Sequence, residues 1–167
     1  MALEMQMSEP QEKLSFPCDL TEWVDKKQLL QWIEEEIDGL DWSSPELLEY
    51  LEAHPEYQPK SMLCLLTYAY ATGAYESDEI VRNCYEDKAF RALAQGRVLT
   101  TNAIGRFRRD NRGLLKWALE QLLKRALRAK YSLGDTLLPA GLRRHLTDLA
   151  VERLNMARHM DRAAQGA

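Results

Sequence analysis

The sequence predicts an all-α protein, a compact domain of about five to eight helices, on the basis of three observations. Apolar residues recur every three or four positions along most of the 167 residues. Capping residues, prolines and glycines divide this pattern into segments of helical length. No run alternates apolar and polar residues, and the Asn-Gly hairpin signal is absent. Together these observations argue against a fold that contains a sheet.

The N-terminal part predicts a loose arm followed by an acidic helix. Residues 1–20 contain two prolines and little periodicity, and we expect them to form a loose arm. A helix is expected at 25–39, where Gly39 is a typical stop signal. The consecutive glutamates 34–36 point about 100° apart around a helix, so they cannot converge on one metal ion and are interpreted as a solvated face.

The middle of the chain predicts the helices of the core. Ser44-Pro45 is typical of a helix start, with a capping residue followed by proline at the first helical position. The helix expected at 59–73 is apolar on nearly every side, so we expect it in the middle of the core. Ser77 is the expected N-cap of the next helix, and a further short helix is expected around 89–93.

Three more helices are expected, one from Thr101, one at 112–130 and one at 139–160. The second has a broad apolar face, and Trp117 lies among the basic residues opposite it. The third has an apolar stripe that Arg153 interrupts. The members of this stripe are Leu142, Leu146, Leu149, Met156 and Met160. The last helix is expected either to pack back on the bundle or to join a second subunit.

Charge is divided unevenly along the chain. Residues 1–59 hold 15 acidic and 3 basic residues, a net charge of −12, whereas 60–167 hold 11 acidic and 19 basic residues, a net of +8. The overall charge of −4 hides this division. Such asymmetry indicates either a nucleic-acid partner for the basic part or an acidic segment that meets a basic one.

No pattern in the sequence is typical of a catalytic or cofactor site. The histidines, His54, His145 and His159, do not stand at metal-ligand spacing with any cysteine or acid. The nucleophile-elbow, Walker and dinucleotide-binding motifs are absent. We therefore expect no metal, no cofactor and no catalysis by this chain.

The cysteines and the apolar runs indicate the compartment. Cys18, Cys64 and Cys84 are odd in number and widely spaced, which predicts reduced and mostly buried thiols of a cytoplasmic protein. The N-terminal residues carry acids and no secretion signal pattern. No apolar run approaches the roughly 20 residues that cross a bilayer, so we expect no membrane association.

The helix expected from Thr101 has two different faces. With Asn102 placed at 0°, Arg106 and Arg109 fall at about 40° and 340°, on one side of the helix. Three apolar residues form the inward face, namely Ala103, Ile104 and Phe107. Thr100 or Thr101 can cap the helix, whose N-terminal turn would then point outward with its positive dipole end.

This arrangement suits a helix that reads the major groove of DNA. Arginine pairs with guanine and asparagine with adenine through two hydrogen bonds each, so Asn102, Arg106 and Arg109 are the expected base contacts. The remaining members of the predicted DNA-binding set are Thr101 and the phosphate contacts Arg108, Arg112 and Lys116. The preceding helix, a turn and this helix form a helix-turn-helix pattern. There are two alternatives to a DNA-reading helix. The arginines can form a solvated basic face, or they can pair with the acidic first half of the chain.

Residues 57–115 contain an ordered set of features: Pro59, the apolar run 62–70, Gly73, Tyr75, Ser77, Glu79-Ile80, Cys84, Glu86-Asp87, Ala89-Phe90-Arg91, Thr101, Ile104 and Phe107-Arg108-Arg109. In this order the features resemble the N-terminal domain of insertion-sequence transposases of the InsH type. The resemblance implies a helical DNA-recognition or assembly domain, and it divides the chain into a loose arm at 1–20, a transposase N-terminal-like domain at 21–131 and a C-terminal helical extension at 132–167.

In that family the helical domain precedes a catalytic domain with an RNase-H-like fold and three metal-binding carboxylates. The resemblance implies that this domain would open soon after Gly134 with a strand that carries the first aspartate. Here a helix follows instead, and no carboxylate triad can be assigned. We therefore expect the DNA-binding part without the catalytic part.

The sequence thus predicts a transposase-related, non-catalytic protein that binds double-stranded DNA, such as the terminal repeats of an element, and that forms a homodimer or joins a transposase as a subunit. The alternative is a helical protein–protein interaction module that assembles transposase subunits. The acidic first half, the Arg153 interruption and an exposed Trp117 favour the alternative.

Overall fold

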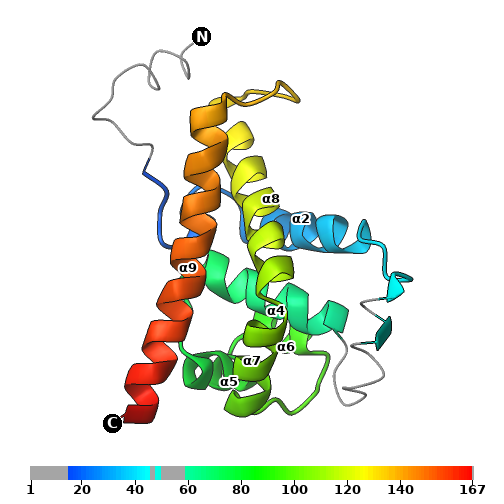
Figure 1. Ribbon diagram of the computed structural model, residues 1–167, viewed down its shortest axis with the longest axis vertical. Helices are drawn as coiled ribbons and strands as arrows, with labels where there is room; N and C mark the ends of the chain where they lie inside the picture. Colours follow the sequence, from blue (N-terminus) through cyan, green and yellow to red (C-terminus); the bar gives the residue numbers. More distant parts are fainter. Residues whose placement is uncertain (1–14, 46–47, 50–58, 167) are drawn as a thin grey trace.

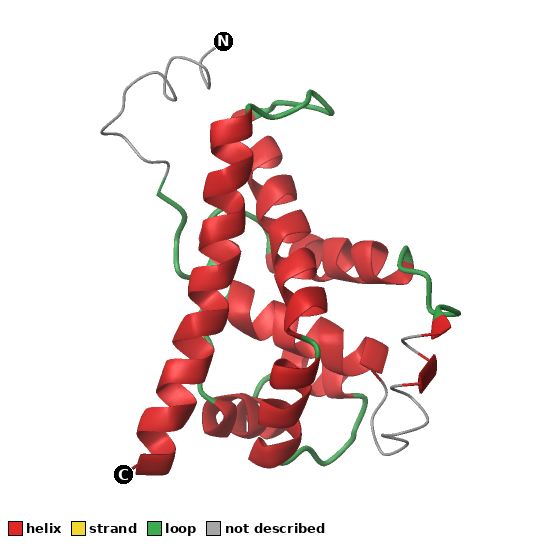
Figure 2. Ribbon diagram, in the orientation of Figure 1, coloured by secondary structure: helices red, strands yellow, loops and turns green. Residues whose placement is uncertain are grey.

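The structure, a computed structural model, describes residues 15–45, 48–49 and 59–166. Within these residues it contains seven α-helices and one short 3-10 helix, and no strand (Figure 2). This confirms the all-α fold class. The helix expected from Ser44-Pro45 lies largely outside the described residues, as does His54.

The helices lie close to their expected positions. Their bounds are η1 Leu20–Glu22, α2 Lys26–Asp38, α4 Pro59–Ala71, α5 Ser77–Glu86, α6 Lys88–Ala94, α7 Thr101–Asp110, α8 Arg112–Tyr131 and α9 Ala140–Gly166. The largest difference is at the end of α9, which continues six residues beyond the expected limit of 160. Its stripe of buried residues also continues past that point, because Asp161 is buried.

Helix α4 forms the centre of the molecule, as its apolar sequence predicts. Every residue from Met62 to Ala71 is buried. Figure 1 shows α4 crossing behind α8 and α9, and it packs against α2, α6, α8 and α9. A helix that is apolar on all sides is stable in water only when other elements cover all of them, which explains this position.

Helices α8 and α9 run antiparallel beside each other and are joined by the loop 132–139 (Figure 1). The long last helix therefore packs back on the bundle. The residues of its buried stripe are Leu142, Leu146, Ala150, Leu154 and Ala157. Two members of the predicted stripe, Met156 and Met160, do not belong to the buried face, since Met156 is 43% exposed and Met160 is half-buried. The small side chain of Ala157 faces the bundle instead.

Arg153 occupies the inward face of α9 and holds the end of α4. Its Nη1 donates to the carbonyl oxygens of Tyr70 at 2.7 Å and Ala71 at 3.3 Å. The same guanidinium donates to the carbonyls of Cys18 at 2.9 Å and Pro17 at 2.7 Å. Because Tyr70 and Ala71 are the last residues of α4, the cation also lies at the negative end of that helix dipole.

Because of these contacts, the folded part of the chain begins before residue 21. The carbonyls of Pro17 and Cys18 are bound by Arg153, and Leu20 is fully buried. The prediction of a loose arm is therefore wrong for 17–20, where an internal cation supplies donors that the sequence pattern does not reveal. Residues 1–14 of the predicted arm lie outside the described residues.

The acidic and basic parts of the chain meet between α2 and α8. Arg125 pairs with Glu35 through Nη1 at 2.7 Å and with Glu36 through Nε at 2.8 Å. Its guanidinium also lies over the ring of Trp32, at 5.9 Å from the centroid. Two of the three consecutive glutamates therefore converge on one arginine rather than forming a wholly solvated face.

Substitution of Arg153 by methionine should lower the free energy of unfolding by about 3 kcal/mol or more, because several buried carbonyls would be left without their charged donor. Urea denaturation followed by circular dichroism measures this change. Arg143→Met, at an exposed position of the same helix, should change stability by less than about 0.5 kcal/mol. Equal effects of the two substitutions would contradict the role of Arg153.

Candidate nucleic-acid interface

Helix α7 begins at a threonine cap and presents two faces. The Oγ1 of Thr100 accepts a hydrogen bond from the backbone N–H of Ala103 at 3.1 Å, so Thr100 is the N-cap. Ala103, Ile104 and Phe107 are buried, as the helical geometry predicts. The helix ends where the N–H of Asn111 bonds the carbonyl of Phe107 at 2.9 Å.

The outward face of α7 carries the predicted base-contact residues. Thr101, Asn102, Arg106 and Arg109 are all exposed. They border one hollow of about 310 Å³ that also reaches the start of α5 and the end of α9. The structure thus brings these four residues together on one side of a short, capped helix. The hydrogen-bonding groups that direct readout requires lie at the surface.

Arg108 differs from its predicted role. Its side chain is 5% exposed, its Nη1 forms an ion pair with Asp161 Oδ2 at 2.6 Å, and it reaches the hydroxyl of Tyr70 at 3.5 Å. Burial lowers the pKa of this guanidinium, but the influence of Tyr70 and Asp161 outweighs burial and the net direction is upward. The prediction of a phosphate contact is wrong for Arg108, because on the helix it lies beside Ile104 at the border of the buried face.

Two further predicted phosphate contacts lie on α8. The Nη2 of Arg112 donates to Oδ1 of Asn155, and the arginine is half-buried. Burial lowers the pKa of Arg112, and the charges of Arg158 and Arg108 lower it further. Lys116 lies one turn along α8 and is 3.9 Å from Glu120. Neither Arg112 nor Lys116 lines the hollow beside α7.

Asp161 joins α9 to the beginning of α5. Its Oδ1 accepts a hydrogen bond from the backbone N–H of Ser77 at 2.7 Å, and its Oδ2 accepts one from the Ser77 hydroxyl at 2.6 Å. The prediction that Ser77 is the N-cap is wrong, because Glu76 holds that position and makes no side-chain capping bond. A carboxylate from a distant helix supplies the missing acceptor at the positive end of α5.

A second hollow, of about 370 Å³, lies where α7, the start of α8 and the end of α9 meet. We refer to it as the arginine pocket. Its lining residues are Arg108, Arg109, Arg112, Arg158, Asp161 and Arg162. Sequence reasoning missed Arg158 and Arg162. Their spacing of four residues, which places both on one side of a helix next to Asp161, is the signal that could have found them.

Helix α6, a turn and helix α7 follow one another along the chain, but α6 and α7 are not an extensively packed pair, so the helix-turn-helix unit stays a prediction. Between them, Gln95 at φ 55° and Gly96 at φ 72° turn the chain away from α6. Helix α7 then packs mainly against α5 and α8. Its orientation is therefore set by those two helices rather than by the helix that precedes it.

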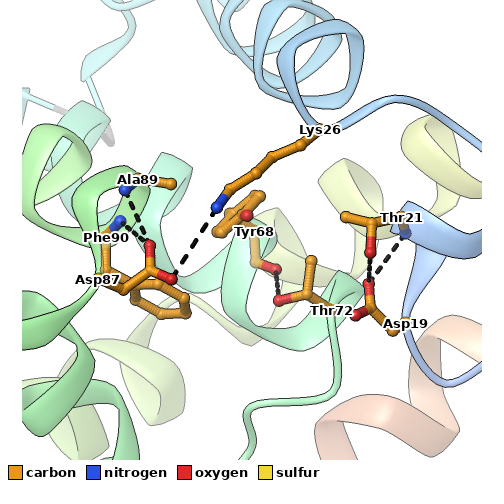
Figure 3. Close-up of polar contacts among 8 residues, drawn as sticks. All are labelled: Asp19, Thr21, Lys26, Tyr68, Thr72, Asp87, Ala89 and Phe90. Carbon is orange, nitrogen blue, oxygen red and sulfur yellow. Dashed lines mark hydrogen bonds and ion pairs between the residues drawn. The ribbon is translucent and has the colours of Figure 1, made fainter.

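A further hollow, of about 510 Å³, lies between α2, α4, α5 and α6 and is mainly acidic. Figure 3 shows Lys26 reaching from α2 toward Asp87, at 3.9 Å. Asp87 also accepts hydrogen bonds from the N–H groups of Ala89 and Phe90, so it caps α6. Asp19 likewise accepts from Thr21. These carboxylates serve as helix caps, and their charge disfavours a nucleic-acid phosphate.

Residues 18–110 match the transposase domain family DUF772. This segment is more than half of the chain. The chain belongs to the transposase domain family. No curated protein and no solved structure matches the chain. The match supports the resemblance to transposases, and the InsH type within them stays a prediction.

The matched transposase domain ends where α7 ends, so α8 and α9 lie beyond it. Arg153, which caps the end of α4, and Asp161, which caps the start of α5, therefore lie outside the matched segment. The described residues include no helix that is long and apolar enough to cross a membrane. Over the same residues, no three histidine, cysteine or acidic side chains form a group that could hold a metal ion.

Substitution of Asp161 by asparagine should lower the free energy of unfolding by about 3 kcal/mol, because it leaves the charge of Arg108 buried without a partner. The matched control is Asp148→Asn, at an exposed position of α9, which should change stability by less than about 0.5 kcal/mol. Both are measured by urea denaturation.

A double-mutant cycle assigns the effect to the ion pair. Arg108→Met in the Asp161→Asn background should cost less than Arg108→Met in the natural sequence. If the two costs are equal, the ion pair is not the source of the destabilisation.

Proposed function

We propose that this transposase-domain protein binds duplex DNA through the exposed face of α7 and has no catalytic activity of its own. The observation that carries the proposal is the grouping of Asn102, Arg106 and Arg109 on the exposed side of a short helix. Asparagine and arginine are the side chains that recognise adenine and guanine through paired hydrogen bonds. Membership of the transposase domain family is consistent with a DNA partner.

The dimensions of α7 fit this role. Helix α7 has 10 residues. An α-helix with its side chains is about 10–12 Å across, and the major groove, which is roughly 12 Å wide, admits a helix of that diameter. The inward residues fix the helix on α5 and α8, so the outward side chains are held by a rigid support. A preorganised contact surface loses less entropy on binding than a loop does.

The distribution of charge also favours DNA at α7. The acidic helix α2 lies far from α7 in Figure 1. Two of the glutamates of α2 are already paired with Arg125. The end of α9 adds Arg158 and Arg162 beside α7. A duplex that approaches α7 therefore meets mainly positive charge, which speeds association and contributes sequence-independent affinity.

The carboxylates near α7 support the non-catalytic part of the proposal. Asp78 and Asp161 line the hollow beside α7. Asp161 is bound by Arg108 and Ser77, so it is engaged in structural contacts. Two-metal phosphoryl transfer needs several carboxylates that converge on the ions, and Asp161 is already used to hold Arg108 and Ser77.

The alternative, an interaction module for transposase subunits, loses the features that favoured it. Trp117 is half-buried against the core rather than exposed. Arg153 binds carbonyls inside the fold. The acidic helix α2 pairs with Arg125. Trp117, Arg153 and two of the acidic residues of α2 thus have partners within the described part of the chain.

The double substitution Arg106→Ala with Arg109→Ala should weaken binding to duplex DNA by about tenfold or more, because each arginine contact to a base contributes roughly 1–3 kcal/mol. Fluorescence anisotropy at low salt measures the affinity. The matched control, Arg143→Ala with Arg144→Ala, removes the same charge from exposed positions at the other end of α9. It should bind nearly as well as the natural protein.

Absence of duplex binding by the natural protein at low salt would overturn the proposal. Equally weakened binding by the two double variants would also overturn it, since the effect would then follow net charge rather than position. Size-exclusion chromatography of the same proteins tests the alternative. A changed oligomeric state of the α7 variant with unchanged DNA affinity would favour subunit assembly.

A further inference from the structure

Three helices bring an unusual concentration of positive charge to the arginine pocket. Arg108 and Arg109 come from α7, Arg112 from the start of α8, and Arg158 and Arg162 from the end of α9. The pocket encloses about 370 Å³, and among the described residues of its lining Asp161 is the single acidic one. Five guanidinium groups therefore face one carboxylate.

The carboxylate neutralises only part of this charge. Asp161 is bound to Arg108 at 2.6 Å and to Ser77 of α5, so its oxygens are occupied on the inner side of the pocket. Arg112 donates to the neutral amide of Asn155. Burial lowers the pKa of Arg112, and the nearby positive charges of Arg158 and Arg108 lower it further. An anion in the pocket would relieve this repulsion.

We propose that the arginine pocket binds a phosphate group of the DNA backbone. This inference rests on the proposed function, and it assigns a second contact of the same DNA to a site that includes the C-terminal helix α9. The exposed residues Arg109, Arg158 and Arg162 are the direct ligands, and Arg112 adds charge from the side.

The lining of the pocket suits a phosphate group. Arginine presents planar sets of N–H donors that match two oxygens of a phosphate at once. Within the described part of the chain every lining residue is charged, so the pocket offers mainly charge and hydrogen-bond donors to an anion. A phosphodiester needs only charge and donors, which this lining supplies.

The position of the pocket favours the DNA backbone as the source of the phosphate. The pocket shares Arg108, Arg109 and Asp161 with the hollow beside α7. A duplex whose bases face Asn102 and Arg106 would therefore carry its adjoining backbone past the end of α9. Arg109 lies on the border of both hollows and can contact either a base edge or the strand.

The test compares two double variants of the full chain. Arg158→Ala with Arg162→Ala removes exposed residues of the pocket, and Arg143→Ala with Arg144→Ala removes the same charge from the opposite end of α9. Affinity for a duplex of arbitrary sequence is measured over about 50–200 mM salt. Thermal melting by circular dichroism confirms that each variant is folded.

The pocket variant should lower the slope of log K against log salt by about 0.9 for each phosphate that it no longer binds. Its affinity at low salt should fall by about tenfold, to the same extent for every duplex sequence, because binding to the backbone carries no sequence information. The control variant should keep the slope of the natural protein. A pocket variant that matches the control would overturn the inference.

Two further measurements distinguish a failure of the pocket assignment from a failure of the proposed function. If the pocket variant matches the control while Arg106→Ala with Arg109→Ala still weakens binding, the pocket assignment fails and the proposed function stands. If the natural protein binds no duplex, both fail. Inorganic phosphate, compared with chloride at equal ionic strength, is tested for an increase in Tm. An increase that depends on Arg158 and Arg162, with an unchanged DNA slope, would assign the pocket to free phosphate and overturn the DNA-backbone source.

Discussion

The fold depends on two polar contacts that α9 makes with the corner between α4 and α5. Arg153 binds the last carbonyls of α4, and Asp161 binds the first N–H of α5. The two residues are eight positions apart, or about 12 Å along the helix. Helix α9 therefore supplies a cation to the negative C-terminal end of α4 and an anion to the positive N-terminal end of α5. The α7 surface depends on this arrangement, because Asp161 also holds Arg108.

The sequence predicted the apolar contacts better than the polar ones. The inward residues of α7 follow from helical periodicity, because the angle of a side chain around the helix decides whether it faces the core. The central position of α4 follows from apolar residues on all of its sides. The buried roles of Arg108, Arg153 and Asp161 do not follow from it. Their partners lie 38 or more residues away in the sequence, and no local pattern encodes a tertiary cap.

Only part of the candidate site could be predicted, because helical geometry describes one helix at a time and not the contacts between helices. The exposed group on α7 was visible from helical geometry, whereas Arg158 and Arg162 join it only because α9 folds back along α8. The charge division of the sequence is satisfied in part within the fold. Arg125 pairs with two acidic residues of α2, and five other arginines of the basic part line the arginine pocket.

The end of α9 contributes both to the fold and to the proposed phosphate site. The same turn of helix that positions Asp161 against α5 also carries Arg158 and Arg162. Opening of this turn would expose the N-terminus of α5 and disperse the pocket together, so a bound anion would shift that local equilibrium toward the closed, capped state. An anion bound in the arginine pocket would therefore reduce local opening of the end of α9 and of the α5 N-terminus that it caps.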